Sequence, residues 1–224
     1  MAKLLQSLIP LLSLLLLATA TTARSQSTSF TYDFYGQKPT DLIYQGDAHF
    51  PSDASGNPLS HPACHSNPIY LSVVFKLGSR FLIPTFFIQP ESSPLGFTGA
   101  SFGIFNPAGL NPSVFAVEFD IYPNAGVDPS YRHVGIDIGS NVSKNKTDVG
   151  GALLGLEVTA RINYVQATKL ISVQVSAGSE SFEVSYVQDL SSFLPQMVEV
   201  GISGNTGGAI EVFDVVAWYL PRLL

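Results

Sequence analysis

Five side chains that can bind a metal ion lie within one short segment, from Glu118 to His133. Glu118 and Asp120 are two residues apart in an apolar run typical of a β-strand, so both side chains point to the same face of that strand. Asn124 and Asp128 follow in a stretch whose prolines and glycine predict a loop. Oxygen ligands alone suit calcium, whereas carboxylates with an imidazole suit manganese or a similar transition ion. The segment therefore predicts a metal loop.

The energetics of two neighbouring carboxylates favour a bound cation at this point of the chain. If Glu118 and Asp120 face the core, their repulsion and their lost hydration are costly unless a cation lies between them. Asp120 and Asp128 could each bridge two ions. The alternative is that Glu118 or Asp120 faces solvent on an edge strand and that the loop is an ordinary turn. The residue types alone leave both interpretations open.

The elements that must position these residues are predicted to be strands, because runs rich in Val, Ile, Phe and Tyr alternate with clusters of Gly, Pro, Asn and Ser. Many short strands with such turns predict an all-β sandwich or barrel in a single domain. One helical turn is expected at Gln188–Leu194. The expected strands are Ser29–Phe34, Ile43–Gln45, Ile69–Leu71, Phe81–Ile88, Val114–Ile121, Arg132–Ile138, Leu153–Asn163, Lys169–Ser176, Glu180–Tyr186, Met197–Ser203 and Ile210–Tyr219.

The first 25 residues have the pattern of a secretory signal peptide: Lys3, a leucine-rich apolar run, and then small residues suited to cleavage. A membrane anchor is the alternative, but the uninterrupted apolar stretch is short. We therefore expect a signal peptide at residues 1–25 and a mature domain at residues 26–224. The mature protein is expected to be secreted and extracellular, in the apoplast or cell wall, with no membrane span.

The charge of the chain argues against polyanionic partners. The formal net charge is −6, and loss of Lys3 and Arg24 with the signal leaves 9 basic against 17 acidic residues, or −8. An acidic chain without a basic run offers little to nucleic acid or to an anionic membrane. Cys64 is the only cysteine, so no internal disulfide can form. We expect it to be a buried thiol, with an intermolecular bridge left open.

The sequence around the candidate ligands resembles the metal loop of the legume lectins. The similar segment, residues 117–140, reads VEFDIYPNAGVDPSYRHVGIDIGS. Other runs that resemble this family are FTYDF, LIYQGDA, HSNPIYL, FGIFN, VSYVQDLSSFLP and FDVVAWYL, so the resemblance covers essentially the whole mature chain. It implies a concanavalin-like antiparallel β-sandwich of the jelly-roll type, and glycans or glycoproteins as partners. It leaves a homodimer open.

The resemblance also implies roles for individual metal ligands. Glu118 and His133 would bind only the transition metal, Mn²⁺ or a similar ion. Asp120 and Asp128 would bridge that metal and Ca²⁺. The calcium site would be completed by a side-chain oxygen and a backbone carbonyl, from Asn124 and Tyr122 respectively.

The same resemblance implies a sugar-binding surface beside the metals. The amide of Asn124 would face a sugar hydroxyl, and the ring of Tyr122 would stack on the apolar face of a pyranose. The backbone N–H of Ala100 and a loop near the C-terminus, with Gly207 and Gly208, would complete the surface. Metals that hold the loop rigid would lower the entropic cost of binding.

One part of the family pattern is missing from this chain. Sugar-binding members carry an acidic residue in an Ala-Asp-Gly-type sequence before the FGIFN motif, and that residue accepts hydrogen bonds from the sugar. Here FLIPTFFIQPESSPLGFTGASFGIFN runs almost directly into the glycine-containing loop. Glu91 is the only carboxylate nearby, and a solvated surface role is the simpler interpretation. We expect weakened sugar binding and a front sheet that lacks one strand, so that it must close up or stay open.

Two N-glycosylation sequons follow the metal loop. They begin at Asn141 and Asn145, in a polar stretch after a predicted strand. We expect a glycan on one or both.

Three classes of function fit these residues. The first is a secreted carbohydrate-binding protein. The second is a glucanase-type enzyme, because Glu118-Phe119-Asp120 matches half of an E-x-D-x-(x)-E strand. The partner position is Tyr122 or Pro123 rather than Glu, so we expect no enzymatic activity. The third is a lectin-fold interaction or defence-signalling protein that no longer binds sugar.

Overall fold

The computed structural model describes residues 30–33, 39–45, 71–76, 82–206 and 214–220. These residues form β-strands and two short 3-10 helices. In chain order they are β1 (Phe30–Asp33), β2 (Leu71–Lys76), β3 (Leu82–Pro90), η1 (Gly99–Ser101), β4 (Leu110–Asp120), β5 (His133–Ser140), β6 (Asn145–Asp148), β7 (Glu157–Val165), β8 (Leu170–Ala177), β9 (Glu180–Val187), η2 (Leu190–Ser192), β10 (Val198–Thr206) and β11 (Asp214–Leu220).

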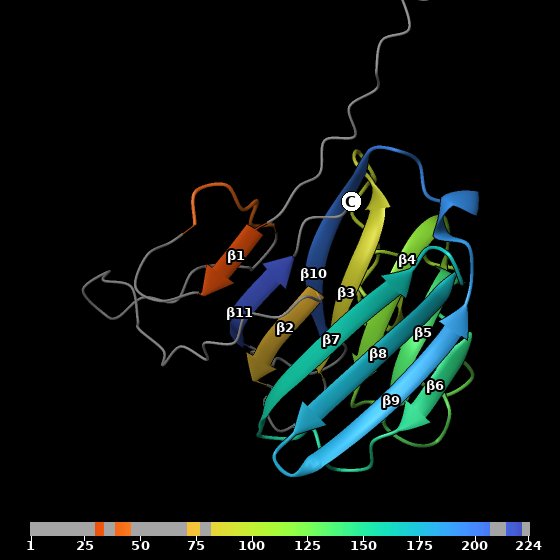
Figure 1. Cartoon of the computed structure of the whole chain (residues 1–224). Helices are drawn as coiled ribbons and strands as arrows, with labels where there is room; N and C mark the ends of the chain where they lie inside the picture. The colour runs from red at the N-terminus through yellow and green to blue at the C-terminus, as the bar shows by residue number, and fades with distance from the viewer. Residues whose placement is uncertain (1–29, 34–38, 46–70, 77–81, 207–213, 221–224) are drawn as a thin grey trace, which may run out of the picture. The chain divides into compact units, whose positions relative to one another are not determined.

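The strands form two antiparallel sheets (Figure 1). The six-stranded sheet has the order β1-β11-β2-β7-β8-β9, and the five-stranded sheet has the order β10-β3-β4-β5-β6. The described strands thus give the predicted antiparallel β-sandwich, and the predicted all-β fold class is confirmed.

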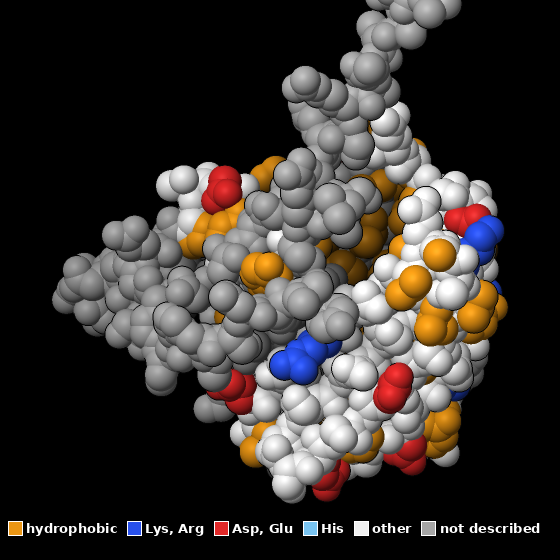
Figure 2. Space-filling view, viewed as in Figure 1, with side chains coloured by type: hydrophobic (Ala, Val, Ile, Leu, Met, Phe, Trp, Pro, Cys, Tyr) orange, Lys and Arg blue, Asp and Glu red, His pale blue; other side chains and the backbone are white. Residues whose placement is uncertain are grey.

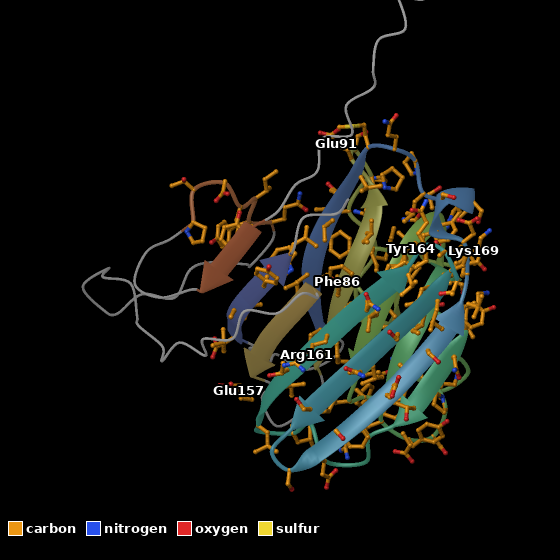
Figure 3. All side chains as sticks on the ribbon, viewed as in Figure 1. Phe86, Glu91, Glu157, Arg161, Tyr164 and Lys169 are labelled. Carbon is orange, nitrogen blue, oxygen red and sulfur yellow. The ribbon has the colours of Figure 1, made fainter. Side chains whose placement is uncertain are left out.

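The main hydrophobic core lies between the two sheets. In β8 every second side chain is buried, as expected for a strand with one face on a core. These side chains pack in one cluster with Phe115, Val117 and Phe119 of β4. Phe86 of β3, labelled in Figure 3, belongs to the same cluster. Burial of apolar area here is the main driving force for association of the sheets.

A second, smaller core covers the opposite face of the five-stranded sheet. Phe102, Ile104 and Phe105, from the segment that follows η1, are buried against Val114 and Ala116 of β4. Because both faces of β4 are covered, its residues 114–120 are all buried. This explains why the run VFAV, residues 114–117, is apolar on both faces instead of alternating.

The outer face of the six-stranded sheet is mainly polar. Arg161, Gln174 and Glu183 lie opposite one another across β7, β8 and β9. Figure 2 views this face, where isolated charged side chains are separated by uncharged ones. No helix among the described residues is both long enough and apolar enough to cross a bilayer.

Most predicted strands that fall on described residues are confirmed, and η2 lies within the predicted helical turn. Three strand assignments were wrong. β2 covers Leu71–Lys76, so it extends five residues beyond the expected strand Ile69–Leu71. Ile43–Gln45 is not a strand, and Ile43 is 86% exposed, so this apolar residue does not mark a buried face. Conversely, β6 lies where only a polar loop was predicted. The signal segment, Cys64, and the expected strand Ile69–Leu71 except for its last residue lie outside the described residues.

Candidate metal and ligand site

The pairing of β4 with β5 brings the candidate ligands together. Glu118 lies opposite Gly135, and Asp120 lies opposite His133. Phe119, between the two acidic residues, points into the main core. The alternation of side chains therefore turns Glu118, Asp120 and His133 to the other face of the sheet.

Four side chains form the candidate metal centre. Ligand atoms of Glu118, Asp120, Asp128 and His133 all lie within 4.8 Å of one another. The first two and His133 are fully buried, and Asp128 is partly buried. His133 Nε2 lies 3.1 Å from Glu118 Oε1. The edge-strand alternative, in which one of the acidic residues faces solvent, is therefore wrong.

Backbone contacts fix the loop between β4 and β5 around these carboxylates. The backbone N–H of Tyr122 donates to Asp120 Oδ1 at 2.6 Å, and the N–H of Asn124 donates to Asp128 Oδ2 at 2.6 Å. Arg132 Nε donates to the carbonyl oxygen of Ile121 at 3.0 Å and joins the two ends of the loop. The carboxylates are thus held in place by hydrogen bonds that leave other oxygen lone pairs free for a cation.

A glycine opposite Glu118 makes room for a further contact. A Cβ atom on Gly135 would lie 2.1 Å from Ser143 Oγ and 2.6 Å from Glu118 Oε1. Ser143 folds over this position and donates a short hydrogen bond to Glu118 Oε1. The side-chain contact between Glu118 and Ser143 therefore requires glycine at position 135.

The electrostatics of the cluster fit a bound cation. Burial, followed by the charges of Glu118 and Asp128, raises the pKa of Asp120 to about 9. Burial and then the charge of Glu118 raise the pKa of Asp137, on the same face of β5, well above its usual range. A divalent cation would remove this repulsion and favour the ionised carboxylates. The donor set of carboxylates and one imidazole suits a transition ion, and the oxygens of the loop suit calcium.

Two polar residues beside the cluster were missed by the sequence analysis. Asp137 is fully buried, and the signal for it was its spacing of four from His133, which puts both side chains on one face of β5. Ser143 comes from the segment between β5 and β6. Nothing in the local sequence indicates its contact with Glu118, because that contact depends on how the segment folds back.

The predicted sugar-binding residues have different environments. Tyr122 is 45% exposed. Asn124 Nδ2 donates to the carbonyl oxygen of Tyr122 at 3.2 Å, so the amide would have to turn to offer its oxygen to calcium. Ala100 lies in η1 and is partly buried. Gly207 and Gly208 lie outside the described residues.

The position of Glu91 excludes it as a substitute acceptor at the metal loop. Thr85 of β3 lies opposite Glu118. Glu91 is six residues farther along, which corresponds to about 20 Å along an extended strand. Figure 3 shows Glu91 at the far end of β3. Glu91 is exposed at that end, which agrees with the solvated surface role expected from the sequence.

The five-stranded sheet closes up around β3. This strand pairs with β4 on one side and with β10 on the other. Between β3 and β4 the described residues contain η1 but no further strand. Of the two outcomes expected for a shortened sheet, closure is the one observed.

Comparison with known proteins identifies the family to which the chain belongs. The legume lectin domain model matches residues 84–222. The chain belongs to the legume lectin family. Agglutinin-2 of Cladrastis kentukea is 33% identical, with 87% of this chain and 80% of that protein covered. This family binds carbohydrates and metal ions, and the described residues contain a cluster that could hold such ions.

Solved structures of legume lectins have the same fold. Lectin II from Ulex europaeus superposes with a TM-score of 0.72 at 25% identity, covering 88% of this chain and 99% of that one. A lectin from Bauhinia forficata in complex with GalNAc gives a TM-score of 0.68 at 26% identity, covering 87% of this chain and 97% of that one. The concanavalin-like sandwich expected from the sequence is thus confirmed.

Proposed function

We propose that this chain is a secreted carbohydrate-binding lectin with a functional calcium and manganese loop and low affinity for single sugars. The buried cluster of Glu118, Asp120, Asp128 and His133 carries the proposal. Buried carboxylates beside one another are costly unless a cation neutralises them. Retention of all four donors favours a chain that still binds metal.

The proposed ligands divide into two sites. Glu118 and His133 would hold a transition ion, and Asp120 and Asp128 would contact both ions. Tyr122 would contribute its carbonyl oxygen to calcium. Bound metals neutralise the carboxylates and keep the loop rigid, so that a ligand meets an ordered surface.

Low sugar affinity follows from the contacts that remain. Asn124 would offer one amide, Tyr122 one stacking face and Ala100 one backbone N–H. Each neutral hydrogen bond contributes about 0.5–1.5 kcal/mol net. The sequence of β3, LIPTFFIQP, contains no carboxylate that could add a charge-assisted bond. Such contacts do not offset the several kcal/mol of freedom lost on association. An extended oligosaccharide or an apolar aglycone could supply the missing contact area.

Titration calorimetry on metal-loaded protein tests this function. We expect dissociation constants above about 1 mM for mannose, glucose and galactose. A glycan array should identify an oligosaccharide that binds, and both a chelator and Asn124→Ala should abolish that binding. A monosaccharide constant below 1 mM that is lost in Asn124→Ala would show that another group replaces the missing acid.

Two other classes of function make different predictions. A glucanase requires a second carboxyl about 5–5.5 Å from the first across the scissile bond. The family consists of lectins, and Tyr122 stands where the strand motif needs an acid, so we propose no enzymatic activity. Metal binding without any hit on the glycan array would instead support the lectin-fold interaction protein.

A further inference from the structure

The two N-glycosylation sequons lie in different environments, although their asparagines are only four residues apart. Asn141 is 7% exposed, between β5 and β6. Asn145 is exposed at the start of β6. An N-linked glycan replaces a hydrogen on Nδ2 and extends into solvent, so the surroundings of that nitrogen decide whether the folded chain can carry it.

Asn141 uses its side chain to hold a neighbouring loop. Its Nδ2 donates to the carbonyl oxygen of Ala100 at 2.8 Å, and its backbone N–H donates to the carbonyl oxygen of Gly109 at 2.9 Å. Gly109 has a φ of 71°, and a Cβ there would lie 2.2 Å from Asn141 Oδ1. The amide is therefore enclosed by the backbone at both ends of the segment 99–109, and a sugar on Nδ2 would have to displace these contacts.

The segment held by Asn141 forms the second core and carries Ala100. Inside it, Ser101 Oγ donates to the carbonyl oxygen of Asn106 at 3.0 Å. Phe102 and Phe105, which belong to the same segment, are fully buried. Displacing the Asn141 amide would remove a buried hydrogen bond and expose this cluster.

Asn145 has room for a glycan. Its Nδ2 donates to the carbonyl oxygen of Ser185 in β9 at 2.8 Å, and its Oδ1 accepts from the backbone N–H of Lys146 at 3.0 Å. A glycosylated amide keeps one hydrogen on Nδ2, so the bond to Ser185 can persist beside a sugar. The side chain is exposed at the edge where β6 meets β9.

We propose that Asn145 is the glycan acceptor of this pair and that Asn141 is a positioning residue for the loop carrying Ala100. Sugar transfer acts on the chain before it folds, so both sequons are accessible then. A chain with a glycan on Asn141 cannot close the segment 99–109, and only the chain with a free Asn141 reaches the native fold. This deepens the proposal of a secreted protein by naming the modified residue.

Glycan mapping tests the acceptor. The chain should be expressed in a eukaryotic host behind that host's own signal peptide, so that the result does not depend on residues 1–25. We expect peptide mass spectrometry of the folded, secreted fraction to find a glycan on Asn145 and none on Asn141. Thr147→Val removes the second sequon but keeps Asn145, and it should abolish the mobility shift on N-glycosidase treatment. Thr147→Ser keeps the sequon and should retain the shift.

A glycan on Asn141 in the folded fraction, an unmodified Asn145 in the wild-type protein, or a shift that persists in Thr147→Val would each overturn the assignment.

The positioning role is measured separately by hydrogen exchange. Asn141→Asp replaces the donor with a carboxylate facing the Ala100 carbonyl, and amide exchange in residues 99–109 should become at least tenfold faster. Asn145→Asp makes the same chemical change at the exposed site and should leave that exchange unchanged. Equal exchange rates in the two variants would refute the role of Asn141.

Discussion

Asp120 lies close to the other charged groups of the candidate site. It is fully buried on β4, and its pKa is raised to about 9 by burial and by the charges of Glu118 and Asp128. In the unfolded chain its pKa returns to about 3.9. Between about pH 4 and pH 9, the folded, metal-free protein therefore keeps a proton on Asp120 that the unfolded chain has released.

This shift gives the metal-free protein an unusual pH dependence. Because the folded pKa is raised, the stability contributed by protonated Asp120 is fully present below about pH 4 and is lost as pH rises toward 9. Melting temperatures of chelator-treated protein should therefore fall between pH 5 and pH 9. Asp120→Asn should flatten this dependence, and saturating metal should remove it from the wild type. A melting temperature that rises across this range in metal-free protein would contradict the assignment.

Gly135 offers a test of the packing around Glu118. A Cβ at this position would overlap Ser143 Oγ and Glu118 Oε1, so Gly135→Ala should destabilise the fold by about 1–3 kcal/mol and weaken metal binding. Gly151→Ala is the control, since a Cβ at Gly151 meets no atom within 4 Å. Urea unfolding and metal titration of both variants measure the effect. Equal stabilities would show that Ser143 can move aside without cost.

At the scale of the elements, β3 lies between β4 and β10 and contains a buried polar group. Thr85 is fully buried opposite Glu118, and its hydroxyl has no hydrogen-bond partner among the described residues. A buried hydroxyl that makes no hydrogen bond costs about 1–3 kcal/mol. Thr85 therefore lowers the stability of the strand that completes the sheet.

Replacing this hydroxyl by a methyl group of similar shape should stabilise the protein. We expect Thr85→Val to raise the free energy of unfolding of the metal-free protein by about 1 kcal/mol. Thr159→Val, on the outer face of β7, should change it by less than about 0.5 kcal/mol. Denaturant unfolding of both variants provides the measurement. If Thr85→Val is destabilising, the Thr85 hydroxyl has a partner such as a bound water.

The sequence predicted those features that depend on the pattern of residues within one short segment. The metal ligands were predicted because they all lie in one segment, which a single strand and loop position. The Asp137 and Ser143 contacts depend on strand register and on a folded-back segment, which local pattern does not specify. β6 reads NKTD and pairs only with β5, so backbone hydrogen bonds rather than an apolar face define it. Ile43 failed as a strand signal because its side chain remains in solvent.

At the scale of the whole molecule, the metal loop and the sandwich are expected to be thermodynamically linked. The ligands occupy the ends of β4 and β5, two neighbouring strands of the five-stranded sheet. A cation that binds only the folded state stabilises it by about 2.7 kcal/mol at a hundredfold excess over its dissociation constant. Loss of metal should therefore affect global stability as well as the loop.

Metal removal tests this linkage. A chelator should lower the melting temperature of the wild type, and excess calcium with manganese should restore it. Asp120→Ala should lose both metals and show no response, whereas His133→Ala should lose mainly the transition metal. Elemental analysis of the folded proteins checks the metal content directly. Properly folded wild type without calcium or a transition metal would refute the metal loop.

The strand order also determines when the sandwich can be completed during synthesis. β1 pairs only with β11, and Phe30 lies opposite Leu220, near the other end of the chain. At 5–20 residues per second, a ribosome needs about 10–40 s to make the residues that separate them. Throughout that time β1 has no partner strand within its own sheet, and its backbone groups remain open to chaperones and to other chains. Such distant pairing also slows folding, because the chain entropy of a very long loop is lost before the contact forms.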